Sequence, residues 1–187
     1  HFGIKPQDSV VVFGCGPVGS TFIQFLNLYG VENIVAIDII DEKLTHVQTH
    51  GAKYAINSSK TDVTEAVRKL YPNGVDYVLD AIGAPFVVNA AMPLIKDRGT
   101  VLCYGVPPVE QITIDFSKAD YNWNVVYQQM PRKEEEGAAH EQVMEWIHDG
   151  KLVIKDFISD YYKFEDSVKA FEDLLNRKIS KKGIIVF

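Results

Sequence analysis

Residues 10–19, Val-Val-Val-Phe-Gly-Cys-Gly-Pro-Val-Gly, decide the fold of this chain. They describe an apolar strand that leads into a glycine-rich turn and then into a helix. Gly14 allows a sharp turn off the strand, and Gly16 has no Cβ, so the backbone can approach a pyrophosphate. Gly19 lets the helix pack close to the sheet, and Pro17 suits a first helical turn, where a missing N–H costs nothing. The stretch therefore predicts a dinucleotide-binding turn with the phosphates at the helix N-terminus.

A carboxylate at the end of the next predicted strand points to the same ligand. Asp38 lies 19 residues after Gly19, which is close to the usual spacing for a carboxylate that accepts hydrogen bonds from a ribose diol. A 2′-phosphate at that place would meet a negative charge, and the next residues, Ile39 and Ile40, supply no arginine. The sequence therefore favours NAD over NADP, although nearby lysines could compensate.

Strands and helices are predicted to alternate along most of the chain. This alternation is typical of an α/β fold with a doubly wound, mainly parallel six-stranded Rossmann sheet covered on both faces. Asp41 and Asp62 are the predicted helix N-caps, and Glu65 completes a capping box with Asp62. The predicted strands are 10–13, 34–37, 54–56, 75–80, 100–104, an edge strand at 122–128 and a last strand at 183–187. The predicted helices are 18–29, 41–50, 62–71, 85–95, 138–148 and 164–176, and the acidic run before 138 is interpreted as a solvated helix start.

Composition favours a small-molecule partner. The 187 residues carry a net charge of −6, and no Lys/Arg cluster offsets it, which argues against a nucleic-acid or anionic-membrane surface. No apolar run approaches the ~18 residues of a membrane span. The two cysteines, Cys15 and Cys103, indicate neither a metal cluster nor a secreted disulfide scaffold, so we expect a cytoplasmic protein. His46 and His50 are expected to be ordinary surface histidines, and no metal site is assigned.

Polar and glycine residues follow two other predicted strands at the edge where ligands bind in such sheets. Asp80 is followed by Ala81-Ile82-Gly83, and the strand at 100–104 runs into Tyr104-Gly105-Val106. For Asp80, the simpler interpretation is that its side chain orients the next turn. Gly83 and Gly105 are the better candidates for letting the backbone approach a ligand.

Several short motifs in a fixed order resemble one known family. Over nearly its whole length, the chain resembles the cofactor domain of medium-chain alcohol and polyol dehydrogenases, and most closely the zinc-dependent branch with sorbitol and alcohol dehydrogenases. The resemblance rests on Ile4-Lys5-Pro6, Asp8-Ser9-Val10, the glycine turn, Asp38, Asp41 with Lys43-Leu44, His50-Gly51-Ala52, Gly74-Val75-Asp76, Gly99, Val101 and Gly105-Val106-Pro107.

The resemblance implies a set of cofactor contacts. The backbone around Gly16, Pro17 and Val18 would hold the pyrophosphate, Asp38 would bind the adenosine ribose, and Lys43 would assist it. The stretches 81–83 and 104–106 would line the adenosine and nicotinamide ends. In the full-length parent, the family's reaction is hydride transfer between a secondary alcohol or polyol and the nicotinamide cofactor.

The resemblance also implies a division of the chain. Residues 1–150 would form the NAD-binding domain, and residues 151–187 would be a remnant of the catalytic domain, whose amino-terminal part is absent. Zinc is expected only in that missing part, so this fragment should bind cofactor and do little chemistry. Relatives often dimerise through the edge strand of this domain, which predicts a homodimer through residues 122–128.

Two other functions remain open from the sequence. One is a zinc-independent, NADPH-using quinone-reductase-like member of the same superfamily, and Asp38 speaks against it. The other is a non-catalytic dinucleotide-sensing module, which an upstream zinc-ligand domain in the parent gene would eliminate.

Overall fold

The chain divides into two units in the computed structural model, which describes residues 3–176 and 178–187. The first unit comprises residues 1–131 and the second residues 132–187. The boundary between Pro131 and Arg132 differs from the one expected at residue 150, so the helix at 133–148 belongs to the second unit.

The first unit is built around a six-stranded sheet of strand order β3-β2-β1-β4-β5-β6. Every neighbouring pair of strands is parallel, which confirms the predicted doubly wound α/β fold. The elements are β1 (Ser9–Phe13), α1 (Pro17–Leu28), β2 (Asn33–Asp38), α2 (Asp41–Gln48), β3 (Tyr54–Asn57), α3 (Val63–Leu70), β4 (Val75–Asp80), α4 (Val87–Ala91), β5 (Ile95–Cys103) and β6 (Asn124–Tyr127).

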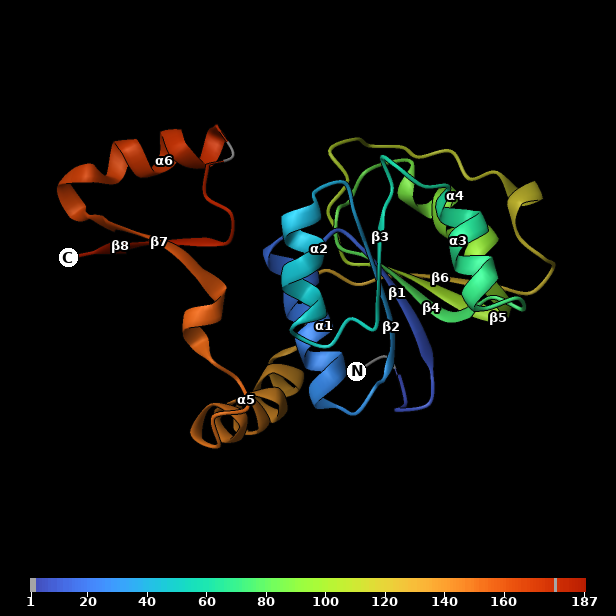
Figure 1. The fold of residues 1–187 in the computed structure, drawn as a ribbon, viewed down its shortest axis with the longest axis horizontal. Coiled ribbons are helices and arrows are strands. Elements are labelled where there is room, and N and C mark those ends of the chain that lie inside the picture. Colours follow the sequence, from blue (N-terminus) through green and yellow to red (C-terminus); the bar gives the residue numbers. More distant parts are fainter. Residues whose placement is uncertain (1–2, 177) are drawn as a thin grey trace. The chain divides into compact units, whose positions relative to one another are not determined.

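The core lies on both faces of this sheet. Figure 1 shows α1 and α2 on one side of the strands and α3 and α4 on the other. Because side chains alternate along a strand, Val10 and Val12 of β1 pack in the cluster with Ile23 of α1, whereas Val11 packs in the cluster with Val87 of α4. All five residues of β1 are buried, as expected for a central parallel strand.

The helix predicted at residues 85–95 is shorter than expected. The α-helix α4 ends at Ala91, a 3₁₀ turn covers Met92–Leu94, and β5 already begins at Ile95, which pairs with Val75. Pro93 within the turn has no backbone N–H to continue an α-helix. The α-helix ends before this proline, and β5 begins five residues earlier than the predicted strand start at residue 100.

The two predicted N-caps have different outcomes. Asp62 caps α3 by accepting a hydrogen bond of 2.8 Å from the backbone N–H of Glu65. The prediction for Asp41 is wrong, because Ile40 is the N-cap of α2 and Asp41 is its first residue. The Asp41 carboxylate instead bonds to Asn57 and Lys60.

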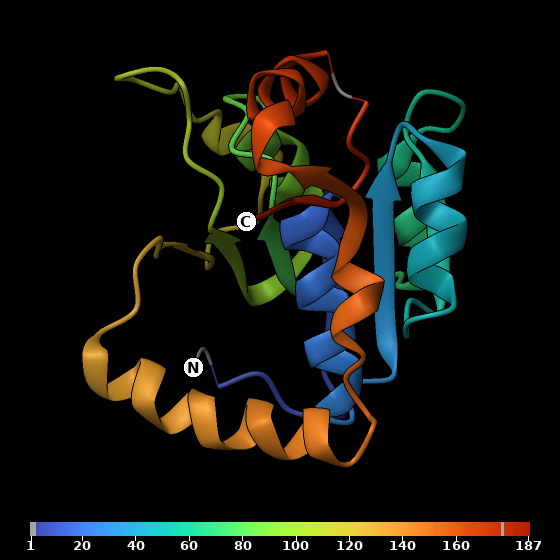
Figure 2. The ribbon, with the colours of Figure 1, turned by 90° about the vertical axis from the view of Figure 1, so that its left-hand side faces the viewer.

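The second unit contains α5 (Lys133–His148), β7 (Ile158–Lys163), α6 (Ser167–Leu175) and β8 (Lys182–Val186). The two strands pair in parallel, and Figure 2 shows the orange-red α6 connecting them. The helix predicted from residue 138 begins earlier, at Lys133, and acidic residues in its first turn favour that start through the helix dipole. None of the described helices has both the length and the apolar character that crossing a lipid bilayer would require.

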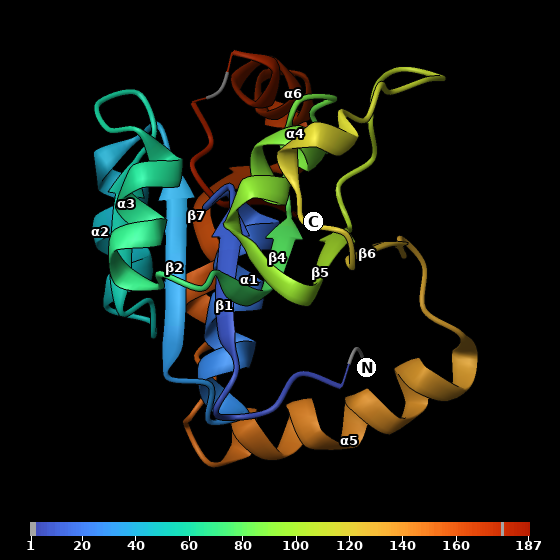
Figure 3. The same cartoon turned by 90° about the vertical axis from the view of Figure 1, so that its right-hand side faces the viewer.

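A partly buried polar bridge joins the starts of β1 and β4, which lie side by side in Figure 3. The Asp76 carboxylate accepts hydrogen bonds from the backbone N–H of Ser9 at 2.9 Å and from its hydroxyl at 2.7 Å, and it pairs with Lys96. Burial tends to raise the pKa of Asp76, but the bonds from Lys96 and Ser9 outweigh it and lower the pKa. A cavity of about 180 Å³ lies beside this bridge, at the opposite edge of the sheet from the glycine turn.

Candidate functional site

The glycine turn connects β1 to α1 and is held tightly by the protein itself. Gly14 has a φ of +89°, and its N–H donates to the carbonyl of Ile37 at 2.8 Å. A Cβ added at Gly19 would lie 1.7 Å from the carbonyl oxygen of Gly14, so the first turn of α1 touches the turn directly. Gly14 and Gly19 are therefore required by the turn and by the packing of the helix onto it.

Gly16 differs from its two neighbours in the motif. It is the residue that precedes α1, and a Cβ added there would meet nothing within 4 Å. No side chain caps α1, and its first turn carries no acidic residue. The helix start therefore presents free backbone N–H groups and a positive dipole end to open space, where an anionic group can bind.

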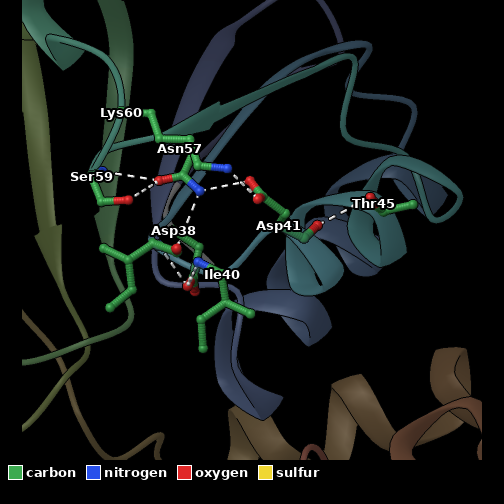
Figure 4. Close-up of polar contacts among 8 residues, drawn as sticks. Asp38, Ile40, Asp41, Thr45, Asn57, Ser59 and Lys60 are labelled. Atoms are coloured by element: carbon green, nitrogen blue, oxygen red, sulfur yellow. Dashed lines mark hydrogen bonds and ion pairs between the residues drawn. The ribbon is translucent and has the colours of Figure 1, made fainter.

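Asp38 lies at the carboxyl end of β2, beside the glycine turn. Its carboxylate accepts three backbone hydrogen bonds, from Cys15 at 2.7 Å, Ile39 at 2.8 Å and Ile40 at 3.0 Å. Figure 4 shows the bonds from the turn that follows β2. The side chain is thus held in one place beside the glycine turn. The oxygen that accepts from Cys15 keeps one lone pair for a further donor, whereas the other oxygen already accepts from both Ile39 and Ile40.

Lys43 of α2 lies close enough to act on the same turn. The pKa of the Cys15 thiol is raised to about 12, mainly by burial and also by the charge of Asp38, while the charge of Lys43 partly opposes the rise. The charges of Asp38 and Lys43 therefore both act on the thiol in the glycine turn. Their binding of a ribose stays a prediction.

Asp80 holds the turn after β4 and is only 3% exposed. Its carboxylate accepts hydrogen bonds of 2.8 Å from the backbone N–H groups of Ile82 and Gly83. Burial raises the pKa of Asp80, and these two bonds oppose the rise. The Asp80 side chain therefore orients the turn that follows β4, which agrees with the simpler interpretation of the sequence.

The structure shows why glycine is needed at positions 83 and 105, which the sequence did not reveal. A Cβ added at Gly105 would lie 2.1 Å from the backbone nitrogen of Gly83, and one added at Gly83 would lie 2.6 Å from the carbonyl of Val106. These glycines let the loops after β4 and β5 touch each other. Their contact with a ligand stays a prediction.

Apolar side chains surround the carboxyl edge of the sheet. Ile82 is 47% exposed and Val106 70% exposed, and Val18 at the start of α1 is also exposed. Tyr104 packs edge-on against Phe22 of α1, with ring centroids 5.1 Å apart. The arrangement offers apolar surface on which the rings of a dinucleotide can lie.

Tyr127, at the end of β6, also lies at the carboxyl edge of the sheet, which the sequence did not indicate. The strand register places it beside Cys103. Burial and the nearby thiol raise the pKa of Tyr127 to about 12, and burial raises that of Cys103 to about 11. Both groups are therefore neutral at physiological pH. The sequence pattern that could have placed Tyr127 at this edge is the alignment of the carboxyl ends of the predicted strands.

The histidines do not build a metal centre within the described residues. His46 and His50 lie with ring centroids 4.2 Å apart, and a nitrogen of His50 bonds to the carbonyl of His46 at 2.8 Å. Over residues 3–176 and 178–187, no group of three His, Cys, Asp or Glu side chains is placed to hold a metal ion.

Comparison with known proteins gives a consistent result. The family model for zinc-binding dehydrogenases matches residues 17–149, which is more than half of the chain. The chain is 26% identical over 97% of its length to an uncharacterized zinc-type alcohol dehydrogenase-like protein, YdjJ, of Escherichia coli K12, and covers 51% of that protein. It is 26% identical over 98% of its length to D-xylulose reductase of Saccharomyces cerevisiae, of which it covers 52%.

The fold is also that of solved alcohol dehydrogenase structures. A short chain alcohol dehydrogenase from Escherichia coli CFT073, solved in complex with NADH, superposes with a TM-score of 0.82 at 21% identity, over 98% of this chain and 53% of the other. The chain spans about half the length of the curated relatives it matches.

Proposed function

The chain belongs to the zinc-binding dehydrogenase family, and we propose that it binds NAD(H) at the carboxyl edge of its six-stranded sheet. The open approach to Gly16 carries this proposal. A Cβ added at Gly14 or Gly19 would collide with the protein, whereas one added at Gly16 would enter open space. The glycine that protein packing does not require is the one that a bound pyrophosphate would require. The NADH held by a relative of the same fold supports the choice of cofactor.

The proposal assigns roles to several of the chain's own residues. Backbone N–H groups in the first turn of α1, including that of Val18, bind the pyrophosphate. The Asp38 carboxylate accepts hydrogen bonds from the adenosine ribose, with Lys43 beside it, and Ile82 and Val106 flank the rings. When bound, the nicotinamide supplies hydride transfer.

The full-length protein is proposed to transfer a hydride between a secondary alcohol or polyol and the nicotinamide. The names of the relatives, among them a D-xylulose reductase, support this class of reaction. Residues 151–187 are proposed to belong with the catalytic domain. The described residues hold no group of three side chains that could bind zinc, so the proposal places no zinc site among them. The two free, buried cysteines fit a reducing cytoplasm.

A titration tests the cofactor proposal directly. We expect the purified chain to bind NADH at least about tenfold more tightly than NADPH, because the 2′-phosphate meets the Asp38 carboxylate. Nicotinamide fluorescence and calorimetry would report both dissociation constants. Binding of neither dinucleotide, or tighter binding of NADPH, would contradict the proposal.

A homodimer through β6 is part of the same proposal. β6 is the outermost strand of the six, and Val126 on it is 36% exposed. An open strand edge can pair with a second copy, and a lysine there would oppose the pairing. We therefore expect Val126→Lys to be monomeric and Val168→Lys, a control in α6, to remain dimeric in light scattering. A monomeric wild-type chain would refute the dimer.

A further inference from the structure

A second charged cluster lies beside Asp38, and the proposed function does not use it. It consists of Asp41 at the start of α2, Asn57 at the end of β3 and Lys60 in the following turn (Figure 4). The side-chain nitrogen of Asn57 donates to the Asp41 carboxylate at 2.6 Å, and the other carboxylate oxygen of Asp41 pairs with Lys60. We refer to these three residues as the Asp41 cluster.

The Asp41 cluster is tied to the residue that is proposed to bind the ribose. Asn57 lies opposite Asp38 in the register of β2 and β3. The Asn57 side-chain nitrogen also donates to the carbonyl of Ile39 at 3.1 Å, and the N–H of Ile39 in turn bonds to the Asp38 carboxylate. The backbone N–H of Ser58 donates to the carbonyl of Asp38 at 3.0 Å. The cluster therefore adjoins the ribose end of the proposed cofactor site.

The cation of the cluster, Lys60, already pairs with the Asp41 carboxylate. The Lys60 side chain is 62% exposed, so it would be free to pair with a ligand anion if Asp41 did not hold it. The bond from Lys60, and then that from Asn57, lowers the pKa of the Asp41 carboxyl, which is therefore charged at neutral pH. A dinucleotide with a 2′-phosphate needs such a cation near the ribose, whereas one with a free diol does not.

We propose that Asp41 is a second determinant of cofactor choice, because it holds Lys60 and so denies the 2′-phosphate of NADP(H) a cation in addition to Lys43. The inference rests on the proposed binding of the dinucleotide beside Asp38. In this arrangement Asp38 repels the extra phosphate, and Asp41 occupies Lys60, whose charge would add to that of Lys43 in offsetting the repulsion. Discrimination against NADP(H) then depends on two carboxylates from neighbouring elements, β2 and α2.

The test is Asp41→Asn, measured as the ratio of the NADPH and NADH dissociation constants. The asparagine can still accept the hydrogen bond from Asn57 but releases Lys60. We expect the ratio to shift toward NADPH by about twofold to fivefold, the range of an exposed ion pair. Asp149→Asn is the matched control, because it also removes an exposed aspartate paired with a lysine, Lys151, but in the second unit. A role in stability alone would weaken both dinucleotides equally.

A double variant identifies the cation. Adding Lys60→Gln to Asp41→Asn should return the ratio to its wild-type value, and a gain that persists would overturn the proposal. An unchanged ratio in Asp41→Asn, with normal NADH binding by the wild type, would overturn the role of Asp41 and leave the proposed function standing. A wild-type chain that binds neither dinucleotide would overturn both.

Discussion

Gly19→Ala is expected to prevent stable folding of the first unit. The new Cβ would lie 1.7 Å from the carbonyl oxygen of Gly14 and 2.8 Å from its carbonyl carbon. Both are backbone atoms of a turn that is itself bonded to β2, so α1 must move off the sheet. We expect a loss of about 3 kcal/mol or more in the free energy of unfolding, measured by chemical denaturation.

Gly16→Ala provides the matched comparison within the same motif. The added Cβ enters open space, and the φ of −69° at Gly16 suits any residue. Stability should therefore change by no more than about 0.5 kcal/mol. NADH binding should weaken by about tenfold or more, because the methyl group occupies the approach of the pyrophosphate. Equal stability of the two variants would show that the contact between Gly19 and Gly14 is not a packing constraint.

Asp38→Ala is expected to abolish most of the affinity for NADH. The variant loses the acceptor for the ribose hydroxyls and leaves the N–H groups of Cys15, Ile39 and Ile40 without their acceptor. Hydrogen bonds to a charged group contribute about 1.5–3 kcal/mol, so the dissociation constant should rise by about tenfold to 150-fold. Calorimetric titration with NADH measures the change.

Two further variants separate charge from shape at this position. Asp38→Asn keeps the size of the side chain but removes its charge, so it should lose most of the preference for NADH over NADPH and keep only the part that Asp41 supplies. Asp120→Ala, at an exposed aspartate of the first unit, should leave both affinities unchanged. If Asp38→Asn kept the full preference for NADH, discrimination against the 2′-phosphate would have to come from other groups.

Much of the fold could be predicted from local patterns along the chain. The apolar runs at β1 and β2 are continuous because each strand is covered on both faces, and this made them easy to recognise. The early end of α4 was harder, because Pro93 allows a 3₁₀ turn that resembles a helix in the sequence.

The candidate site was predictable only in part. The glycine turn and Asp38 belong to one continuous motif, so their proximity follows from the strand–helix–strand connection. The role of Asp41 was misassigned, because its partners lie 16 and 19 residues away, on the next strand and in the turn after it. The contact between Tyr127 and Cys103 likewise depends on the register of two strands separated by a long loop.

The order of residues in the chain was sufficient to identify a parallel α/β sheet, a glycine turn and a carboxylate beside it. These features follow from interactions among neighbours in sequence, namely turn geometry, side-chain periodicity and helix starts. The packing of loops distinguished Gly16 from Gly14 and Gly19, and it brought Gly83 against Gly105. It also brought Lys60 to Asp41. Such contacts join segments that are distant in sequence, and their distances are set only when the strands align and the helices pack on the sheet.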